Sequence, residues 1–459
     1  MTIKRVFIAN RGEIAVRIIR AAHALGIETV QGVSLADKDS MASKIADRAV
    51  VIGPAPSRDS YLHVNTIVHA AKATGCDALH PGYGFLSERA ELARACEKEG
   101  IVFVGPQAQV IEDLGDKLRA RELAEKSGIS SVPGSGHVES PAAALVAATK
   151  IGFPVVMKAS AGGGGRGMFV ARNRDTIEES FERASGEALE AFGDGTLYLE
   201  RYIENARHVE VQIAGDGRGN AVHFGERDCS VQRRYQKVVE EAPCVLMSNV
   251  LRKRLHKAAV KLVSSLNYSN VGTVEFLFDV ECDEFYFIEV NTRIQVEHPV
   301  TEQVTGYDLV QMQFRLAAGE KGARPLQGAI SISRHAIECR LNAEDPYNKF
   351  MPSPGRINKW GPAKGAGVRV DSHCYDNYLV PPFYDSMIGK IVVTGNDRLS
   401  AVRRLQVSLD DFHIEGLVSN LPLLREIIAH RDFENNSFHT RWLEQDLLPA
   451  FESAKKEKE

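Results

Sequence analysis

The 459-residue sequence has little that would tie it to a membrane, a nucleic acid or an oxidising compartment. No apolar run approaches the roughly 20 residues that a membrane-spanning helix needs. The formal net charge of −4 gives no basic field for nucleic acid or anionic lipid. The seven cysteines are scattered without a CxxC pair, which argues against a disulfide framework. The opening KRVFIAN indicates a strand rather than a signal or transit segment. We therefore expect a cytoplasmic protein that binds neither membrane nor nucleic acid.

Two common nucleotide-binding fingerprints are incomplete. The first turn, NRGEIA, has only Gly12 where a nicotinamide dinucleotide site needs several glycines. The run Gly162–Gly167 formally contains GxGxxG, but the strand-like MFVA follows it and no GK[ST] ends it. A strand, a glycine-rich turn and a second strand instead predict a flap whose backbone N–H groups lie over phosphates. A flexible surface hairpin is the alternative interpretation.

The composition that remains is that of an ordinary globular protein, 44% hydrophobic and 25% charged. The length exceeds one typical domain and suggests about three units. Residues 1 to about 113 alternate strands with helices, which predicts a parallel sheet with covered faces. Mixed short strands and two helices follow residue 325. The expected fold class is therefore α/β, or α+β over the whole chain.

A predicted hairpin near the middle of the chain brings acidic residues together. Its strands, Val271–Asp279 and Glu284–Asn291, flank a polar turn that places Glu275 opposite Glu289, with Asn291 on the same face. Opposed carboxylates repel, so a cation is expected between them, and this all-oxygen set suits Mg²⁺. A solvated strand face is the alternative. The loop that follows adds Arg293, Gln295, Glu297 and His298. Such a density of polar groups beside a metal site is typical of a catalytic loop.

Two other stretches are rich in charge. On charge alone, residues 226–243 indicate a solvated strand of ion pairs rather than an anion site. In residues 335–346, Arg340 follows Glu338 and is most simply interpreted as one half of a salt bridge. Neither stretch decides a function by itself.

Motifs along almost the whole chain resemble those of biotin carboxylase, in the ATP-grasp superfamily. They are NRGEIAVRIIRAA, HPGYGFLSE, GDKLRAR, KASAGGGGRGM, RHVEVQI, ERDCSVQRRYQKVVEEAP, EVNTRIQVEHPVTE, CRLNAEDP and PPFYDSMIGK. The resemblance spans residues 3 to 446. It implies an N-terminal α/β domain at 1–113, an ATP-grasp domain at 114–330, a C-terminal β-rich domain at 331–447 and a tail at 448–459. A mobile lid would span about 131–203.

The resemblance also implies a set of nucleotide contacts. Residues that would hold the ATP phosphates or close over them are Lys117, Lys158, Gly163, Gly164, Gly165, Arg166 and Gly167. Residues that would meet the adenine are Glu200, Arg201 and Ile203, and those near the ribose are His208 and Gln232.

The same resemblance assigns a metal site and a reaction centre. Mg²⁺ or Mn²⁺ would be held by Glu275, Glu289 and Asn291, in agreement with the hairpin register. Bicarbonate would be bound by Lys237, Arg293, Gln295 and Val296. Glu297 would be the general base that deprotonates bicarbonate, and Arg340 would stabilise the biotin enolate. This is chemically coherent, because a bound anion and an enolate oxygen both need fixed cations and donors.

The implied reaction makes carboxyphosphate from ATP and bicarbonate and then carboxylates biotin. Biotin would be presented on a biotin carboxyl carrier protein, in the first half-reaction of acetyl-CoA carboxylase in fatty acid biosynthesis or of a related acyl-CoA or pyruvate-type carboxylase. Carboxyltransferase subunits and a second copy of the chain are further expected partners. Lys158 follows Met157 but precedes Ala159, so it lacks the two methionines that flank a biotinylated lysine. We expect a stand-alone subunit that is not itself biotinylated.

The sequence departs from the family pattern at Tyr235, at Gln303 and at EGLVSN (415–420). These positions lie outside the metal and bicarbonate motifs. Two other functions are alternatives to the one that the resemblance implies. Another ATP-grasp carboxylate–amine ligase would lack the roles of Arg340 and the EHPVTE loop, and a catalytically inactive nucleotide-binding regulator would not need every catalytic position filled.

Overall fold

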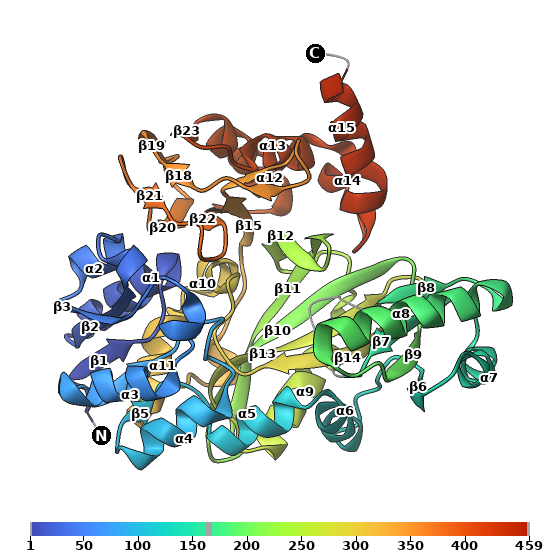
Figure 1. Ribbon diagram of the computed structural model, residues 1–459, viewed down its shortest axis with the longest axis horizontal. Coiled ribbons are helices and arrows are strands. Elements are labelled where there is room, and N and C mark those ends of the chain that lie inside the picture. The colour runs from blue at the N-terminus through green and yellow to red at the C-terminus, as the bar shows by residue number, and fades with distance from the viewer. Residues whose placement is uncertain (1, 161–167, 457–459) are drawn as a thin grey trace.

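The computed structural model describes residues 2–160 and 168–456. Figure 1 shows the N-terminal part at one side, the C-terminal part above it, and long central strands between them and a smaller sheet on the opposite side. These parts surround a common centre, to which each contributes residues.

The N-terminal part is built on a five-stranded parallel sheet in the order β3-β2-β1-β4-β5. The strands are β1 (Arg5–Ile8), β2 (Glu28–Ser34), β3 (Arg48–Gly53), β4 (Ala78–His80) and β5 (Val102–Phe103), and the main covering helices are α1 (Gly12–Ala24), α3 (Val64–Ala73) and α4 (Ala90–Lys98). Val6 and Ile8 join the core beneath α1, whereas Phe7 joins the core beneath α3. Successive side chains of β1 thus point to opposite, covered faces, which confirms the predicted parallel α/β sheet.

The central sheet has eight strands in the order β14-β13-β10-β11-β12-β15-β22-β20, all paired antiparallel. Its strands are β10 (Ala206–Asp216), β11 (Ala221–Arg233), β12 (Gln236–Ala242), β13 (Ser269–Asp279), β14 (Glu284–Asn291), β15 (His335–Asn342), β20 (Val368–Ser372) and β22 (Met387–Gly395). Pairing of β12 with β15 carries the sheet across residue 330, where the sequence suggested a domain boundary. The later, β-rich part of the chain therefore shares a sheet with the part before it.

A four-stranded sheet, β6-β9-β7-β8, forms a separate layer between residues 134 and 201. It comprises β6 (Gly134–Val138), β7 (Val155–Ala159), β8 (Phe169–Ala171) and β9 (Leu197–Arg201), covered by α7 (Pro141–Ile151) and α8 (Ile177–Phe192). Ser140 caps α7 by accepting a hydrogen bond from Ala143 N, and Pro141 occupies the first turn. Val155, Met157 and Leu199 belong to an apolar core that this layer does not share with the central sheet. We call these four strands and two helices the small sheet layer.

The remaining elements connect these layers or complete the C-terminal part. They are η1 (Leu35–Asp37), α2 (Met41–Ile45), η2 (Ser57–Asp59), α5 (Ala108–Gly115), α6 (Lys117–Lys126), η3 (Arg174–Thr176), α9 (Asn249–Ser265), α10 (His298–Thr305), α11 (Leu309–Ala317), η4 (Gln327–Ala329), β16 (Glu344–Asp345), β17 (Met351–Pro352), β18 (Gly355–Arg356), β19 (Lys359–Gly361), β21 (Leu379–Val380), α12 (Arg398–Asp410), β23 (His413–Glu415), α13 (Leu421–Ala429), α14 (Arg431–Glu434), η5 (Leu443–Leu447, a π-helical turn) and α15 (Leu448–Lys456). Among the described residues, no helix combines the length and the apolar character that crossing a bilayer requires.

Candidate active site

A cavity of about 910 Å³ lies where the N-terminal part, the small sheet layer and the central sheet meet. Fifteen predicted site residues line it: Lys117, Lys158, Glu200, Arg201, Ile203, His208, Gln232, Lys237, Glu275, Glu289, Asn291, Arg293, Gln295, Val296 and Arg340. Glu297 is buried behind this lining. Gly163, Gly164, Gly165, Arg166 and Gly167 lie outside the described residues, so the expected glycine flap stays a prediction.

The hairpin of β13 and β14 has the register that the sequence predicts, with Glu275 paired to Glu289. Glu275 Oε1 accepts hydrogen bonds from Asn291 Nδ2 and Gln295 Nε2, each at 2.8 Å, and Lys237 Nζ lies 2.9 Å from the same oxygen. Burial alone would raise the pKa of Glu275, but Lys237 and a nearby histidine hold it well below its usual range. Glu275 is therefore ionised and well solvated by protein groups.

Glu289 lies in a less balanced environment. Burial and the charge of Glu275 raise the pKa of Glu289. A divalent cation between the two carboxylates would lower the pKa of Glu289 again. The possible ligand atoms of Glu275, Glu289 and Asn291 are the hard oxygens that Mg²⁺ prefers. The residues present thus fit the predicted metal.

A second trio could be mistaken for a metal site. Ligand atoms of His208, Glu210 and Glu275 lie within 4.8 Å of one another. The Lys237 ammonium already contacts both carboxylates of this trio. We therefore interpret it as an ion-pair cluster and keep the hairpin carboxylates as the metal candidates.

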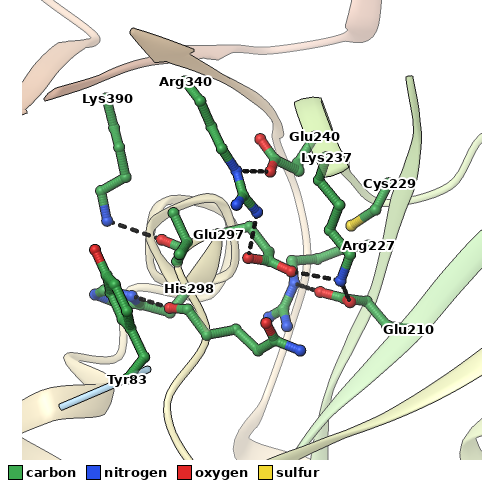
Figure 2. A network of polar contacts seen from close by, with 12 residues as sticks. Tyr83, Glu210, Arg227, Cys229, Lys237, Glu240, Glu297, His298, Arg340 and Lys390 are labelled. Atoms are coloured by element: carbon green, nitrogen blue, oxygen red, sulfur yellow. Dashed lines mark hydrogen bonds and ion pairs between the residues drawn. The ribbon is translucent and has the colours of Figure 1, made fainter. Parts of the chain in front are cut away.

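Glu297 immediately precedes α10 and is fully buried, with 0% of its surface exposed. Its Oε1 lies 2.7 Å from Lys237 Nζ, and its Oε2 accepts a hydrogen bond from Arg340 Nη2 at 2.8 Å (Figure 2). Burial alone would raise the pKa of Glu297, but these two cations lower it. The predicted base is thus held ionised between two of the predicted anion-binding residues.

Lys237 is the cation on which the carboxylates converge. Its ammonium contacts Glu210, Glu275 and Glu297, all three of them buried. Burial would lower the pKa of Lys237, but the three carboxylates raise it well above the ordinary lysine value. Arg340 similarly bridges Glu297 and Glu240, with Nε donating to Glu240 Oε1 at 2.5 Å.

The expectation of a solvated ion-pair strand at residues 226–243 is wrong. Arg227 has no exposed surface, because β11 is an interior strand covered by α9 and α10. Its guanidinium is satisfied entirely by protein groups: Glu210, Gln212, Thr273 and Thr301. Arg227 and Glu210 are site residues that sequence patterns did not single out, and the signal available was a run of charges within a β-rich stretch.

The loop 293–297 is supported by Lys390 of β22 and, through it, by the N-terminal part. Lys390, which is fully buried, donates to the Val296 carbonyl at 2.8 Å and lies 3.0 Å from Glu13. Glu13 in turn accepts a hydrogen bond from Tyr83. Glu13 belongs to the motif NRGEIA and Tyr83 to the motif HPGYGF, so both motifs contribute to the support of this loop.

Lys158 and Glu200 form an ion pair on neighbouring strands of the small sheet layer. Glu200 also accepts a hydrogen bond from Arg121 Nη1, at 2.9 Å, on α6. Arg121 was missed, although its spacing of four residues from Lys117 places both on one helix face. The carboxylate of Glu200 already pairs with two cations. The predicted contact with adenine would therefore be made by the Glu200 backbone, or by the carboxylate after it has left one of these cations.

The remaining predicted nucleotide residues also contact one another or line the cavity wall. His208 Nδ1 lies 2.9 Å from Gln232 Nε2, and Arg201 Nη2 donates to Asp279 at 2.9 Å. Tyr235, one of the departures from the family pattern, occupies the β11–β12 turn with φ of 63° and lines the cavity. Positive φ at a non-glycine residue is uncommon and concentrates at functional sites.

Comparison with known proteins agrees with this geometry. Three family profiles match in sequence: biotin carboxylase, N-terminal domain, at residues 2–111; carbamoyl-phosphate synthase L chain, ATP binding domain, at 116–324; and biotin carboxylase C-terminal domain, at 338–445. Biotin carboxylase 1 of Bacillus subtilis is 48% identical over 443 residues, covering 96% of this chain and 98% of that protein.

Solved structures give the same result. A biotin carboxylase–βγ-ATP complex from Campylobacter jejuni has a TM-score of 0.92 at 44% identity, covering 96% of this chain and 99% of the other. The biotin carboxylase domain dimer of Hydrogenobacter thermophilus 2-oxoglutarate carboxylase, with MgADP, ADP and bicarbonate, has a TM-score of 0.91 at 45% identity, covering 97% and 98%. The fold and the site together define an ATP-dependent ligase of the ATP-grasp class. The chain belongs to the biotin carboxylase family. Membership in this family does not favour the carboxylate–amine ligase alternative.

Proposed function

We propose that this protein carboxylates biotin on a carrier protein, using ATP, bicarbonate and Mg²⁺ or Mn²⁺. The observation that carries the proposal is Glu297, a buried and ionised carboxylate held between Lys237 and Arg340 at one end of the cavity. A base between two cations is suited to a substrate that is itself an anion and gains charge as it reacts.

In the proposed first step, Glu297 accepts the proton of bicarbonate. An oxygen of the resulting carbonate bonds to the γ-phosphorus of ATP as the bond to the bridging oxygen of ADP breaks, which gives carboxyphosphate. Lys237 and Arg340 lower the pKa of Glu297 in the structure. We propose that bicarbonate, bound by Lys237, Arg293, Gln295 and the Val296 backbone, takes over part of their charge and makes Glu297 a stronger base.

In the proposed second step, biotin N1′ gives up its proton to the departing phosphate and bonds to the carboxyl carbon as the bond from that carbon to phosphate oxygen breaks. Arg340 would stabilise the negative charge on the ureido oxygen of biotin, since its guanidinium is fixed at both ends.

Nucleotide binding is proposed for the opposite end of the cavity. Lys117 and Lys158 would contact the phosphates, and the neighbourhood of Glu200, Arg201 and Ile203 would bind the adenine, with His208 and Gln232 near the ribose. Glu275, Glu289 and Asn291 would hold the metal, which when bound neutralises phosphate charge. We also propose residues 114–330 as the nucleotide-binding domain, 1–113 and 331–447 as its flanking domains, and about 131–203 as a lid; 448–459 would be a tail.

The proposed partners are a biotin carboxyl carrier protein and carboxyltransferase subunits, with a homodimer as the assembled form. One similar structure is a domain dimer from a 2-oxoglutarate carboxylase, so relatives of this fold serve more than acetyl-CoA carboxylase. We propose an acetyl-CoA carboxylase or a related acyl-CoA or pyruvate-type carboxylase as the complex.

The test is the production of ADP by the purified protein. ADP should form only when bicarbonate is present, faster with biotin and fastest with a biotinylated carrier, and the carrier should gain ¹⁴C from labelled bicarbonate. ADP formation that needs an amine and a carboxylate other than bicarbonate would contradict the proposal, and so would the absence of label on the carrier.

A further inference from the structure

Two buried carboxyl groups lie opposite each other behind Arg340. Glu240 on β12 pairs with Glu338 on β15 in the sheet register, and neither has any exposed surface. Within the described part of the chain, both carboxyl oxygens of Glu338 and the Oε2 of Glu240 are buried without a hydrogen-bond partner. The proposed mechanism gives no task to either residue.

The surroundings of this pair are apolar on one side and charged on the other. Helix α10 covers the apolar side with Val300 and Val304, which pack against Ala336 and Val392 of the sheet. The charged and titratable groups near the pair are Arg340 and Cys339 on β15, Lys390 on β22, Cys229 on β11, Lys237 on β12 and Glu297 just before α10.

Among the described residues, Arg340 is the one cation that donates a hydrogen bond to the pair. Its Nε donates to Glu240 Oε1 at 2.5 Å, while its Nη2 donates to Glu297 Oε2 at 2.8 Å (Figure 2). Two anchors on different edges of a planar guanidinium fix its orientation. Without Glu240, only the bond to Glu297 would remain, and a single hydrogen bond leaves the guanidinium free to rotate.

We propose that Glu240 is a positioning residue that holds the Arg340 guanidinium beside Glu297, and that Glu338 stays neutral and leaves this task to Glu240. The inference rests on the proposed function, in which Arg340 acts on biotin. The two carboxyl groups thus differ in charge and in role, although they lie on adjacent strands and are equally buried.

The protonation states support this division. Burial raises the pKa of Glu240 to about 7, against the opposing effect of Arg340. Burial, with the charge of Glu240, raises the pKa of Glu338 well above its ordinary value. As pH rises, Glu240 therefore loses its proton first and gains the charge that holds Arg340, while Glu338 keeps its proton.

The experiment compares Glu240→Gln with Glu338→Gln, which make the same chemical change at neighbouring buried positions. Rates of biotin-dependent carboxylation are measured from pH 6 to 9. In the unaltered protein kcat should rise as pH passes through about 7. Glu240→Gln should lower kcat at pH 8 by about 10–100-fold, the worth of a hydrogen bond to a charged group, without changing KM for ATP. It should also abolish the rise near pH 7.

Glu338→Gln should stay within about twofold of the unaltered protein and keep the rise, because an amide replaces a group that is already neutral. Glu240→Asp, which keeps the charge on a shorter side chain, should recover part of the rate. Equal losses in the two glutamine variants, or an unaltered pH profile in Glu240→Gln, would overturn the inference. If Glu240→Gln fails to fold, the failure of Glu240→Asp to retain the rise would do the same. Failure of the proposed function would differ, since even the unaltered protein would then not carboxylate biotin.

Discussion

At the buried end of the cavity three carboxylates share one ammonium group, and this local imbalance decides how single residues behave there. The ammonium is that of Lys237, and the carboxylates are those of Glu210, Glu275 and Glu297. Anions that enter the cavity compete for the same cation. The arrangement thus couples the protonation of Glu297 to what is bound beside it.

Substitution of Glu297 by Gln tests the proposed base. It should reduce bicarbonate-dependent ATP cleavage by about 10²–10⁴-fold, the usual contribution of a positioned general base. ADP release is measured at saturating ATP, with thermal unfolding to count folded protein. Glu302→Gln is the matched control, because Glu302 is a buried carboxylate on α10, the helix that follows Glu297, and pairs with Arg17 and Arg369 instead. A normal rate per folded molecule in Glu297→Gln would show a structural role only.

Glu289→Gln tests the metal assignment. Removing one charge from a site that balances Mg²⁺ and polyphosphate should lower turnover by about two orders of magnitude or more. ATP binding measured in EDTA should change little. Glu284→Gln on the same strand serves as control, since Glu284 forms an exposed ion pair with Arg254. A near-normal rate for Glu289→Gln at saturating Mg²⁺ would refute the assignment.

At the scale of elements, one wall of the cavity is part of the central sheet and another is part of the separate small sheet layer. The hairpin β13–β14 belongs to the central sheet, whereas the small sheet layer has its own core. Arg121 of α6 reaches Glu200 of β9 and joins the small sheet layer to the rest of the chain by a hydrogen-bonded ion pair. A nucleotide that offered phosphate oxygens to the same cations would compete with Glu200 for this contact.

Hydrogen exchange tests whether the small sheet layer closes on nucleotide. Amides of β7 and β9 should exchange more slowly once a non-hydrolysable ATP analogue is added, because closure orders this layer. Amides of β1, in the N-terminal sheet, provide the internal control and should not change. Equal protection of β7 and β9 with and without the analogue would indicate a rigid layer.

At the scale of the whole molecule, the eight-stranded sheet joins the two later parts of the chain into one unit. Glu241 on β12 shows how polar contacts reinforce this joint. Its Oε2 lies 2.7 Å from His335 Nε2 on β15 and accepts a hydrogen bond from Arg398 Nε on α12 at 2.7 Å. Burial would raise the pKa of Glu241, but these partners lower it to about 2.

The folded pKa of Glu241 lies below the unfolded value, so its stabilising effect is present above about pH 4.5 and is lost as pH falls toward 2. Glu241→Gln should cost about 3–5 kcal/mol near neutral pH, the usual cost of breaking a buried ion pair. The difference from the unaltered protein should shrink as pH falls from 5 to 2. Denaturant unfolding at several pH values measures it, with exposed Glu415→Gln as control. A difference independent of pH would contradict the assignment.

The sequence by itself determined the local features. A short polar turn and the alternation of side chains were enough to place Glu275 opposite Glu289, because strands joined by a tight turn have few possible registers. The N-cap of α7 is local in the same way, because a Ser-Pro pair such as Ser140-Pro141 indicates a helix start by itself. The class of protein also followed from sequence, since its motifs extend over nearly the whole chain.

Only the tertiary structure decided which distant residues meet. Arg340 reaches Glu297 across 43 positions and Lys237 reaches it across 60, through the pairing of β12 with β15 that no local pattern predicted. Arg227 is buried, in a stretch whose charge suggested solvent exposure, because β11 is an interior strand covered by α9 and α10. Charge patterns report what a strand carries, but burial and ion pairing depend on the strands and helices that later cover it, and those contacts form only when the whole chain folds.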